Sequence, residues 1–149
     1  MVSNQTKKKI SASLEDYLEA IYLIIEEKQA VKAVEIARFL NVGRSSVTEA
    51  LKSLASKGLV NYGRYDVLTL TPSGEKIAKK VIKKHKILYN FFKNVLNLNE
   101  EEANQNACQI EHIISEDAFN KFTKYIEFNE TYSKNNDEYL KNLKDFMEK

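Results

Sequence analysis

Three residues whose side chains bind transition metals lie within five positions of one another: Cys108, Glu111 and His112. Residues at i, i+3 and i+4 share one flank of a helix, with Cβ atoms about 5–6 Å apart. A thiolate, a carboxylate and an imidazole together suit Fe²⁺, Mn²⁺, Co²⁺ or Zn²⁺ better than Ca²⁺ or Mg²⁺. The spacing therefore predicts a transition-metal site, with an ordinary buried cysteine in a coincidental cluster as the alternative.

Three further side chains are candidate ligands at other points of the chain. His85 interrupts an apolar stripe on a long predicted helix, which is also typical of a hydrogen-bonded core histidine. Asp16 and Glu19 stand at i and i+3 on the first predicted helix. Their alternative interpretation is local, because Ser13 and Asp16 could form a capping box and Glu19 could be solvated.

Apolar residues at helical spacing, with one Pro and four Gly in the whole sequence, predict a mainly α chain. Two β-prone runs flank a turn at Gly63 and predict a hairpin over 59–70. Thr71 and Pro72 predict the cap and first residue of a long helix. The predicted helices span about 13–28, 34–40, 45–57, 71–96, 99–114, 115–127 and 131–147.

Helix, short helix, three-residue turn, helix and hairpin is the order of a winged helix-turn-helix. We therefore predict a DNA-binding domain over 1–71, followed by an all-helical domain over 72–149. The third helix would lie in the major groove, and Arg64 would stand at the tip of the wing. The side chains predicted to contact DNA are Arg44, Ser45, Ser46, Thr48, Lys52 and Arg64.

Charge is distributed unevenly along the chain. Residues 1–94 hold 17 Lys and Arg against 9 Asp and Glu, whereas residues 95–149 hold 6 against 12. A basic half followed by an acidic half is typical of a DNA-binding domain joined to a regulatory or dimerisation domain. A winged helix can also serve as a protein-interaction module, but the basic surplus favours duplex DNA as the partner.

Other functional classes are not favoured. No segment has the roughly 18 apolar residues of a membrane span, and no secretory signal is present. A single cysteine fits a reducing compartment, so we expect a cytoplasmic protein with no membrane partner. The sequence lacks a Gly-rich phosphate loop or nucleophile elbow, and the candidate ligands leave no obvious general base. We therefore expect neither an enzyme nor a small-molecule substrate.

Several of these segments, in order, resemble the diphtheria-toxin-repressor family of iron- and manganese-dependent regulators. The resemblance extends from about residue 11 to residue 128 and suggests the short, two-domain type. It is carried by Ser-Leu-Glu-Asp-Tyr-Leu-Glu-Ala-Ile-Tyr at 13–22, Arg-Ser-Ser-Val-Thr at 44–48, Lys-His at 84–85 and Ala-Cys-Gln-Ile-Glu-His-Ile-Ile-Ser at 107–115.

The resemblance implies a homodimeric repressor of metal-homeostasis genes that binds operator DNA when it carries Mn²⁺ or Fe²⁺, with Co²⁺, Zn²⁺ or other divalent ions as substitutes. An alternative is a winged-helix regulator that senses another signal, its metal site being structural or absent. The metal ligands implied by position are Asp16, Glu19, His85, Cys108, Glu111 and His112.

The implied ligand set is a hybrid of the two branches of the family. Asp16 resembles the manganese branch, whereas Cys108 resembles the iron branch. Tyr89 and Asn104 stand where the second metal site of the iron branch has Glu and His. The physiological ion and the number of ions per chain therefore stay open at this point.

Overall fold

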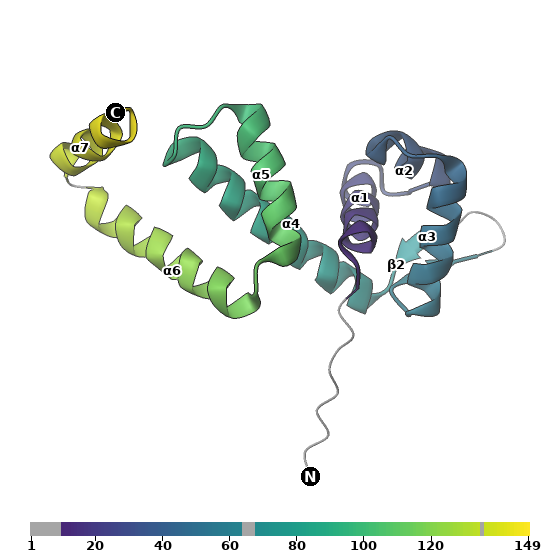
Figure 1. The fold of residues 1–149 in the computed structure, drawn as a ribbon. Coiled ribbons are helices and arrows are strands. Elements are labelled where there is room, and N and C mark those ends of the chain that lie inside the picture. The colour runs from purple at the N-terminus through teal and green to yellow at the C-terminus, as the bar shows by residue number, and fades with distance from the viewer. Residues whose placement is uncertain (1–9, 64–67, 135) are drawn as a thin grey trace, which may run out of the picture. The chain divides into compact units, whose positions relative to one another are not determined.

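The computed structural model describes residues 10–63, 68–134 and 136–149, and it confirms a mainly α fold with one small hairpin (Figure 1). The chain divides into two compact units, Met1–Ile82 and Lys83–Lys149, so the division falls inside α4. None of the described helices has the length and apolar character needed to cross a membrane. The elements are α1 (Ala12–Lys28), α2 (Ala33–Leu40), α3 (Arg44–Ser56), β1 (Val60–Tyr62), β2 (Leu68–Leu70), α4 (Pro72–Asn94), α5 (Glu100–Ile113), α6 (Glu116–Ser133) and α7 (Asp137–Met147).

The first unit is a helix-turn-helix built around one apolar core. α1 begins after Ser11, whose side chain accepts a hydrogen bond from the backbone N–H of Leu14. The predicted cap at Ser13 is therefore wrong by two residues, and Ser13 lies inside the helix. The core of this unit is formed by buried side chains from α1, α2, α3 and both strands, among them Leu18, Ile21, Ile36, Val47, Leu51, Leu54, Val60 and Leu68.

A tight turn joins α2 to α3. Asn41 adopts a left-handed backbone conformation with φ 53°, and Gly43 is the residue that precedes α3. Asn tolerates this conformation better than most residues, because its short polar side chain can bond locally. Val47, Ala50, Leu51 and Leu54 are buried on one side of α3, so its opposite side is presented to solvent.

The hairpin and the start of α4 are packed together. β1 and β2 pair antiparallel, with Val60 opposite Leu70 and Tyr62 opposite Leu68. Thr71 caps α4 as predicted, because its hydroxyl accepts from the backbone N–H of Gly74 and donates to the carbonyl of Gly58. A Cβ at Gly74 would lie 1.9 Å from the carbonyl oxygen of Leu59, so only glycine fits there.

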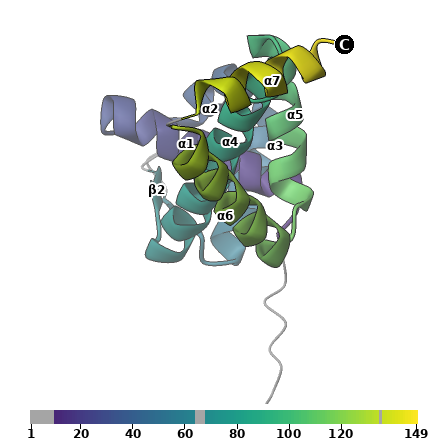
Figure 2. The ribbon, with the colours of Figure 1, turned by 90° about the vertical axis from the view of Figure 1, so that its left-hand side faces the viewer.

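The second unit contains the C-terminal half of α4 together with α5, α6 and α7. Leu88, Ala103, Ala107 and Phe119 supply its buried apolar side chains. The rings of Phe91 and Phe122 also pack edge to face, with centroids 4.8 Å apart. α6 extends well beyond the predicted end at 127, and the chain then changes direction into α7 (Figure 2).

Candidate metal centre and nucleic-acid interface

α5 brings the three central candidate ligands together. The ligand atoms of Cys108, Glu111 and His112 all lie within 4.8 Å of one another. Ala103 and Ala107 are fully buried, and these small side chains fix which flank of α5 faces the interior. One helical turn further on, Glu111 is 1% exposed and His112 is 9% exposed. The predicted cluster therefore exists as a group of neighbouring side chains on α5, with Glu111 and His112 buried and Cys108 exposed.

Glu111 carries the clearest chemical signature of this cluster. Its Oε2 lies 2.6 Å from Nδ1 of His85, and its Oε1 lies 3.3 Å from Nε2 of His112. Oε1 is buried, and no described residue makes a hydrogen bond to it. Burying a carboxylate oxygen without a donor is unfavourable, and proteins compensate by pairing the charge or coordinating a metal. A divalent cation beside Oε1 would provide that compensation, so this donor set fits a transition metal.

Lys84 of α4 contacts the backbone at the C-terminal end of α5, the helix that carries the cluster. It lies in the buried stripe of α4 between Val81 and Leu88, and it is itself only 9% exposed. Its ammonium donates to the carbonyl oxygen of Ile114 and lies 5.6 Å from the centroid of the Phe119 ring. A cation at the C-terminal end of a helix is favoured by the helix dipole. This role of Lys84 was not predicted from the sequence, although its spacing from the apolar residues Val81 and Leu88 indicates that it shares their buried side of α4.

His85 lies on α4 and contacts the cluster on α5. Its Nδ1 contacts the Glu111 carboxylate, and its Nε2 lies 3.1 Å from Oδ1 of Asn104, which stands one turn before Cys108 on α5. Tyr89, one turn further along α4, stacks on the His85 ring with centroids 6.3 Å apart and planes 10° apart. The structure thus places His85 beside Glu111, as a histidine in contact with a candidate ligand.

Asp16 and Glu19 lie on α1 in the first unit, and each is half-buried. They share a helix with the core residues Leu18 and Ile21, so their immediate surroundings are set by the DNA-binding unit. Their assignment as metal ligands stays a prediction that rests on the sequence.

The exposed side of α3 presents most of the predicted DNA contacts. Arg44, Ser45, Ser46 and Lys52 are exposed. Thr48 is half-buried, and its hydroxyl donates to the backbone carbonyl of Arg44 at 3.0 Å, which satisfies its hydrogen within the helix. The predicted contact at Arg64 lies outside the described residues.

Two family models match this chain in sequence. An iron-dependent repressor N-terminal DNA-binding domain matches residues 9–68, and an iron-dependent repressor metal-binding and dimerisation domain matches residues 71–140. The chain belongs to the iron-dependent repressor family. The family's DNA-binding domain contains α3, and its metal-binding domain contains α5 with the Cys108, Glu111 and His112 cluster.

Individual relatives agree with the family assignment. An uncharacterized HTH-type transcriptional regulator of Methanocaldococcus jannaschii is 40% identical over 119 residues, which cover 79% of this chain and 95% of the relative. The HTH-type transcriptional regulator MntR of Bacillus subtilis is 32% identical over 137 residues, covering 92% and 93%. The structure of the manganese regulator SloR has a TM-score of 0.70 and 28% identity, covering 77% of this chain and 54% of SloR. This chain therefore spans about half the length of that protein.

Proposed function

We propose that this protein is a transcriptional repressor in which a divalent transition metal, held by α5, controls the binding of α3 to operator DNA. The observation that carries the proposal is the buried Glu111 carboxylate, whose Oε1 lacks a hydrogen bond from the described residues and lies beside His112. Family membership supports both parts, because its two domains are described as DNA binding and as metal binding with dimerisation.

The donor set supports Mn²⁺ or Fe²⁺ as the effector, with Co²⁺ or Zn²⁺ as substitutes in experiments. Imidazole and carboxylate ligands accept all of these ions, while the Cys108 thiolate favours the softer ones. Asp16 and Glu19 are proposed as further ligands on the resemblance of their helix to that of the family. When bound, the ion would place positive charge next to Glu111, and this charge would be removed when the ion dissociates.

A ligand from α1 would explain how metal affects DNA binding. α1 packs in the same core as α3, so an ion bound by both α1 and α5 would restrict the position of the recognition helix. In a homodimer, the two recognition helices must meet half-sites about 34 Å apart along the duplex. We propose that the metal shifts the population towards that spacing, which requires up to about 5 kcal/mol of differential binding.

The side chains proposed to meet DNA include four that are exposed on α3. Arg44 and Lys52 supply charge for phosphates or guanine edges, and Ser45 and Ser46 supply short hydrogen-bonding groups. Thr48 and Arg64 complete the set on sequence grounds. We place the repressor in the cytoplasm, where duplex DNA and a reduced Cys108 are both available.

The proposal is tested by selecting genomic fragments of the source organism on the purified protein, anaerobically, with Mn²⁺, with Fe²⁺ and with chelator. We expect palindromic promoter fragments to be enriched only when metal is present. Glu111→Gln should lose this enrichment, whereas Glu101→Gln, the same charge change at an exposed position of α5, should keep it. Equal enrichment with metal and with chelator would retain DNA binding and refute metal control.

A further inference from the structure

The turn that ends α3 is bonded directly to the start of α4 through Thr71. The Thr71 hydroxyl donates to the carbonyl oxygen of Gly58 at 2.7 Å and accepts from the backbone N–H of Gly74 at 3.1 Å. The backbone N–H of Thr71 also donates to the carbonyl oxygen of Leu59 at 3.1 Å. Capping α4 requires only that the hydroxyl accepts a hydrogen bond. The bond to Gly58 is therefore an additional contact, and it joins two different elements.

Backbone packing at this junction is close. A Cβ at Gly74 would lie 1.9 Å from the carbonyl oxygen of Leu59 and 2.9 Å from its carbonyl carbon, so the two backbones are in direct contact. Leu59 is buried, and Ala78, one turn after Gly74, is fully buried in the core that also contains Leu54 of α3. Closely packed interiors transmit displacement because they contain little free space. A change in the direction of α4 is therefore passed to the turn that ends α3.

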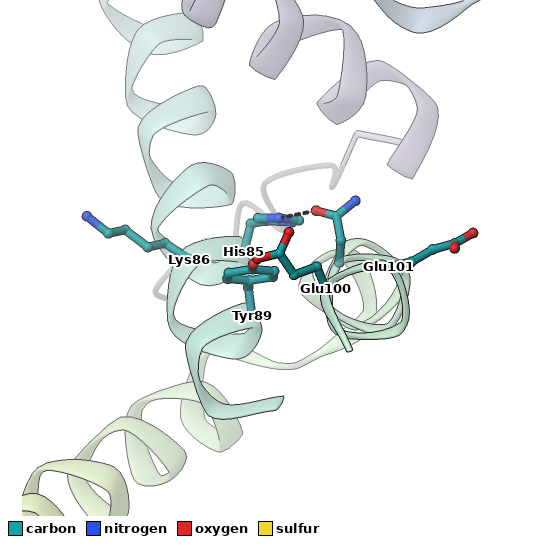
Figure 3. A pocket seen from close by; sticks show the side chains of 6 residues that line it. His85, Lys86, Tyr89, Glu100 and Glu101 are labelled. Carbon is teal, nitrogen blue, oxygen red and sulfur yellow. Dashed lines mark hydrogen bonds between the residues drawn. The ribbon is translucent and has the colours of Figure 1, made fainter. Parts of the chain in front are cut away.

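α4 is also the element in which the chain passes between the two units. The first unit ends at Ile82 and the second begins at Lys83, so the chain crosses once, inside this helix. Within the second unit α4 contacts α5. The ring nitrogens of His85 lie 2.6 Å from Oε2 of Glu111 and 3.1 Å from Oδ1 of Asn104, the second contact being the dashed line in Figure 3. One helix thus contacts the end of α3 in its first turn and the helix of the candidate ligands about three turns later.

We propose that Thr71 is a positioning residue for α3: its hydroxyl couples the end of the proposed recognition helix to α4, so that metal bound in the second unit changes the placement of α3. The inference rests on the proposed function, because it specifies a contact through which metal control reaches DNA binding. Without the hydroxyl, the Gly58 carbonyl and the Gly74 N–H lose their shared partner, and α4 can change direction without moving the end of α3. Metal would still bind, but it would favour the DNA-binding arrangement by a smaller factor.

The test compares operator binding with Mn²⁺ and with chelator, using the full chain, a selected operator duplex and fluorescence anisotropy. Mn²⁺ affinity is measured separately without DNA. In wild type the ratio of the two operator affinities is expected to be about 5 to 150. Thr71→Val, which replaces the hydroxyl by a methyl group, should lower this ratio about fivefold, the equivalent of one net hydrogen bond. Its Mn²⁺ affinity should equal that of wild type, because Thr71 contacts no candidate ligand among its hydrogen bonds.

Two further variants serve as controls. Thr71→Ser retains the hydroxyl and should retain the wild-type ratio. Thr69→Val is the same substitution at an exposed position of β2, two residues earlier, and should also retain it. A role in stability alone would lower the melting temperature of Thr71→Val and leave the ratio unchanged.

An unchanged ratio in Thr71→Val would overturn the inference and leave Thr71 as a helix cap. Loss of Mn²⁺ affinity in this variant would also overturn it, because the effect would then lie at the metal site. Should Thr71→Val fail to fold by circular dichroism, Thr71→Asp decides by the same ratio, since a carboxylate accepts from the Gly74 N–H but has no hydrogen for the Gly58 carbonyl. A wild-type ratio of one would instead refute the proposed function, and the inference with it.

Discussion

The proposed recognition helix α3 and the proposed metal-binding helix α5 distribute their polar side chains in opposite ways. α3 buries Val47, Leu51 and Leu54 and exposes Arg44 and Lys52. α5 buries two alanines and, beside them, the ionisable side chains of Glu111 and His112. On α3 the polar groups are available to a ligand outside the protein, whereas on α5 they are available to an ion that enters it.

This difference separates two ways in which a helix contributes to function. The inner side of α3 is apolar, so the stability of that helix comes from its own core and does not depend on DNA. α5 contains a buried carboxylate oxygen without a hydrogen bond from the described residues, and this is compensated when a cation binds. We therefore expect substitutions on the inner side of α3 to affect folding, and those on the inner side of α5 to affect the response to metal.

The largest effect is expected from Leu51→Ala in the core of the first unit. Leu51 is fully buried, and truncating a buried leucine lowers the free energy of unfolding by about 2–5 kcal/mol. Chemical denaturation with chelator present measures this loss. Lys52→Ala, one position along and exposed, should stay within about 0.5 kcal/mol of wild type. Equal losses in the two variants would contradict the orientation of α3.

An effect of similar size is expected at α5, where the substitution changes the stabilisation provided by metal and not the stability of the metal-free fold. Metal at 100 times its dissociation constant should stabilise wild type by about 2.7 kcal/mol. Glu111→Gln should lose this gain while keeping the metal-free stability, because glutamine removes a buried charge and retains a hydrogen-bonding side chain of the same size beside His85. Thermal unfolding with Mn²⁺ and with chelator measures both quantities. A variant that is still stabilised by Mn²⁺ would exclude Glu111 from the site.

These two helices also show which structural features could be predicted from the sequence and which could not. The inner side of α3 follows from apolar spacing, so its orientation and the exposed positions were predictable. The cluster on α5 was predictable from residue types at i, i+3 and i+4. Its burial was not, because periodicity alone does not show whether a charged side chain turns inward.

Contacts between helices could not be predicted in the same way. That His85 contacts both Glu111 and Asn104 depends on how α4 packs against α5, which no local pattern specifies. The end of α6 was placed too early because its last turns expose Phe128 and Tyr132 and lack a clear apolar stripe. The cap of α1 was misplaced because Ser11 and Ser13 are equally suitable by residue type.

A smaller effect is expected from oxidation of Cys108. A thiolate ligand is open to peroxide when no ion protects it, and its sulfenic or sulfinic product is a poorer ligand. Peroxide applied before Mn²⁺ should therefore weaken metal binding about tenfold, or ~1.4 kcal/mol, and peroxide applied after Mn²⁺ should have little effect. Cys108→Ser should show no dependence on this order. Unchanged affinity of oxidised wild type would argue against Cys108 as a ligand.

The smallest expected effect concerns a single exposed lysine of α3. If Lys52 contacts a phosphate, Lys52→Gln should reduce the salt slope of DNA binding by about one per contact and weaken all sequences alike. Lys124→Gln, the same charge change at an exposed position of α6, should leave the slope unchanged. Fluorescence anisotropy over a series of salt concentrations measures both slopes, and identical slopes in the two variants would remove Lys52 from the interface.

The central claim, that the metal held by α5 and the DNA bound by α3 are coupled, is tested most directly by one reciprocal measurement. Mn²⁺ binding to the wild-type chain is measured with and without a selected operator duplex, at fixed salt. Coupling is reciprocal by thermodynamic necessity, so operator DNA must tighten Mn²⁺ binding by the factor by which Mn²⁺ tightens operator binding. We expect a 5- to 150-fold tightening, the range typical of such coupling. The same Mn²⁺ affinity with and without operator would contradict the account.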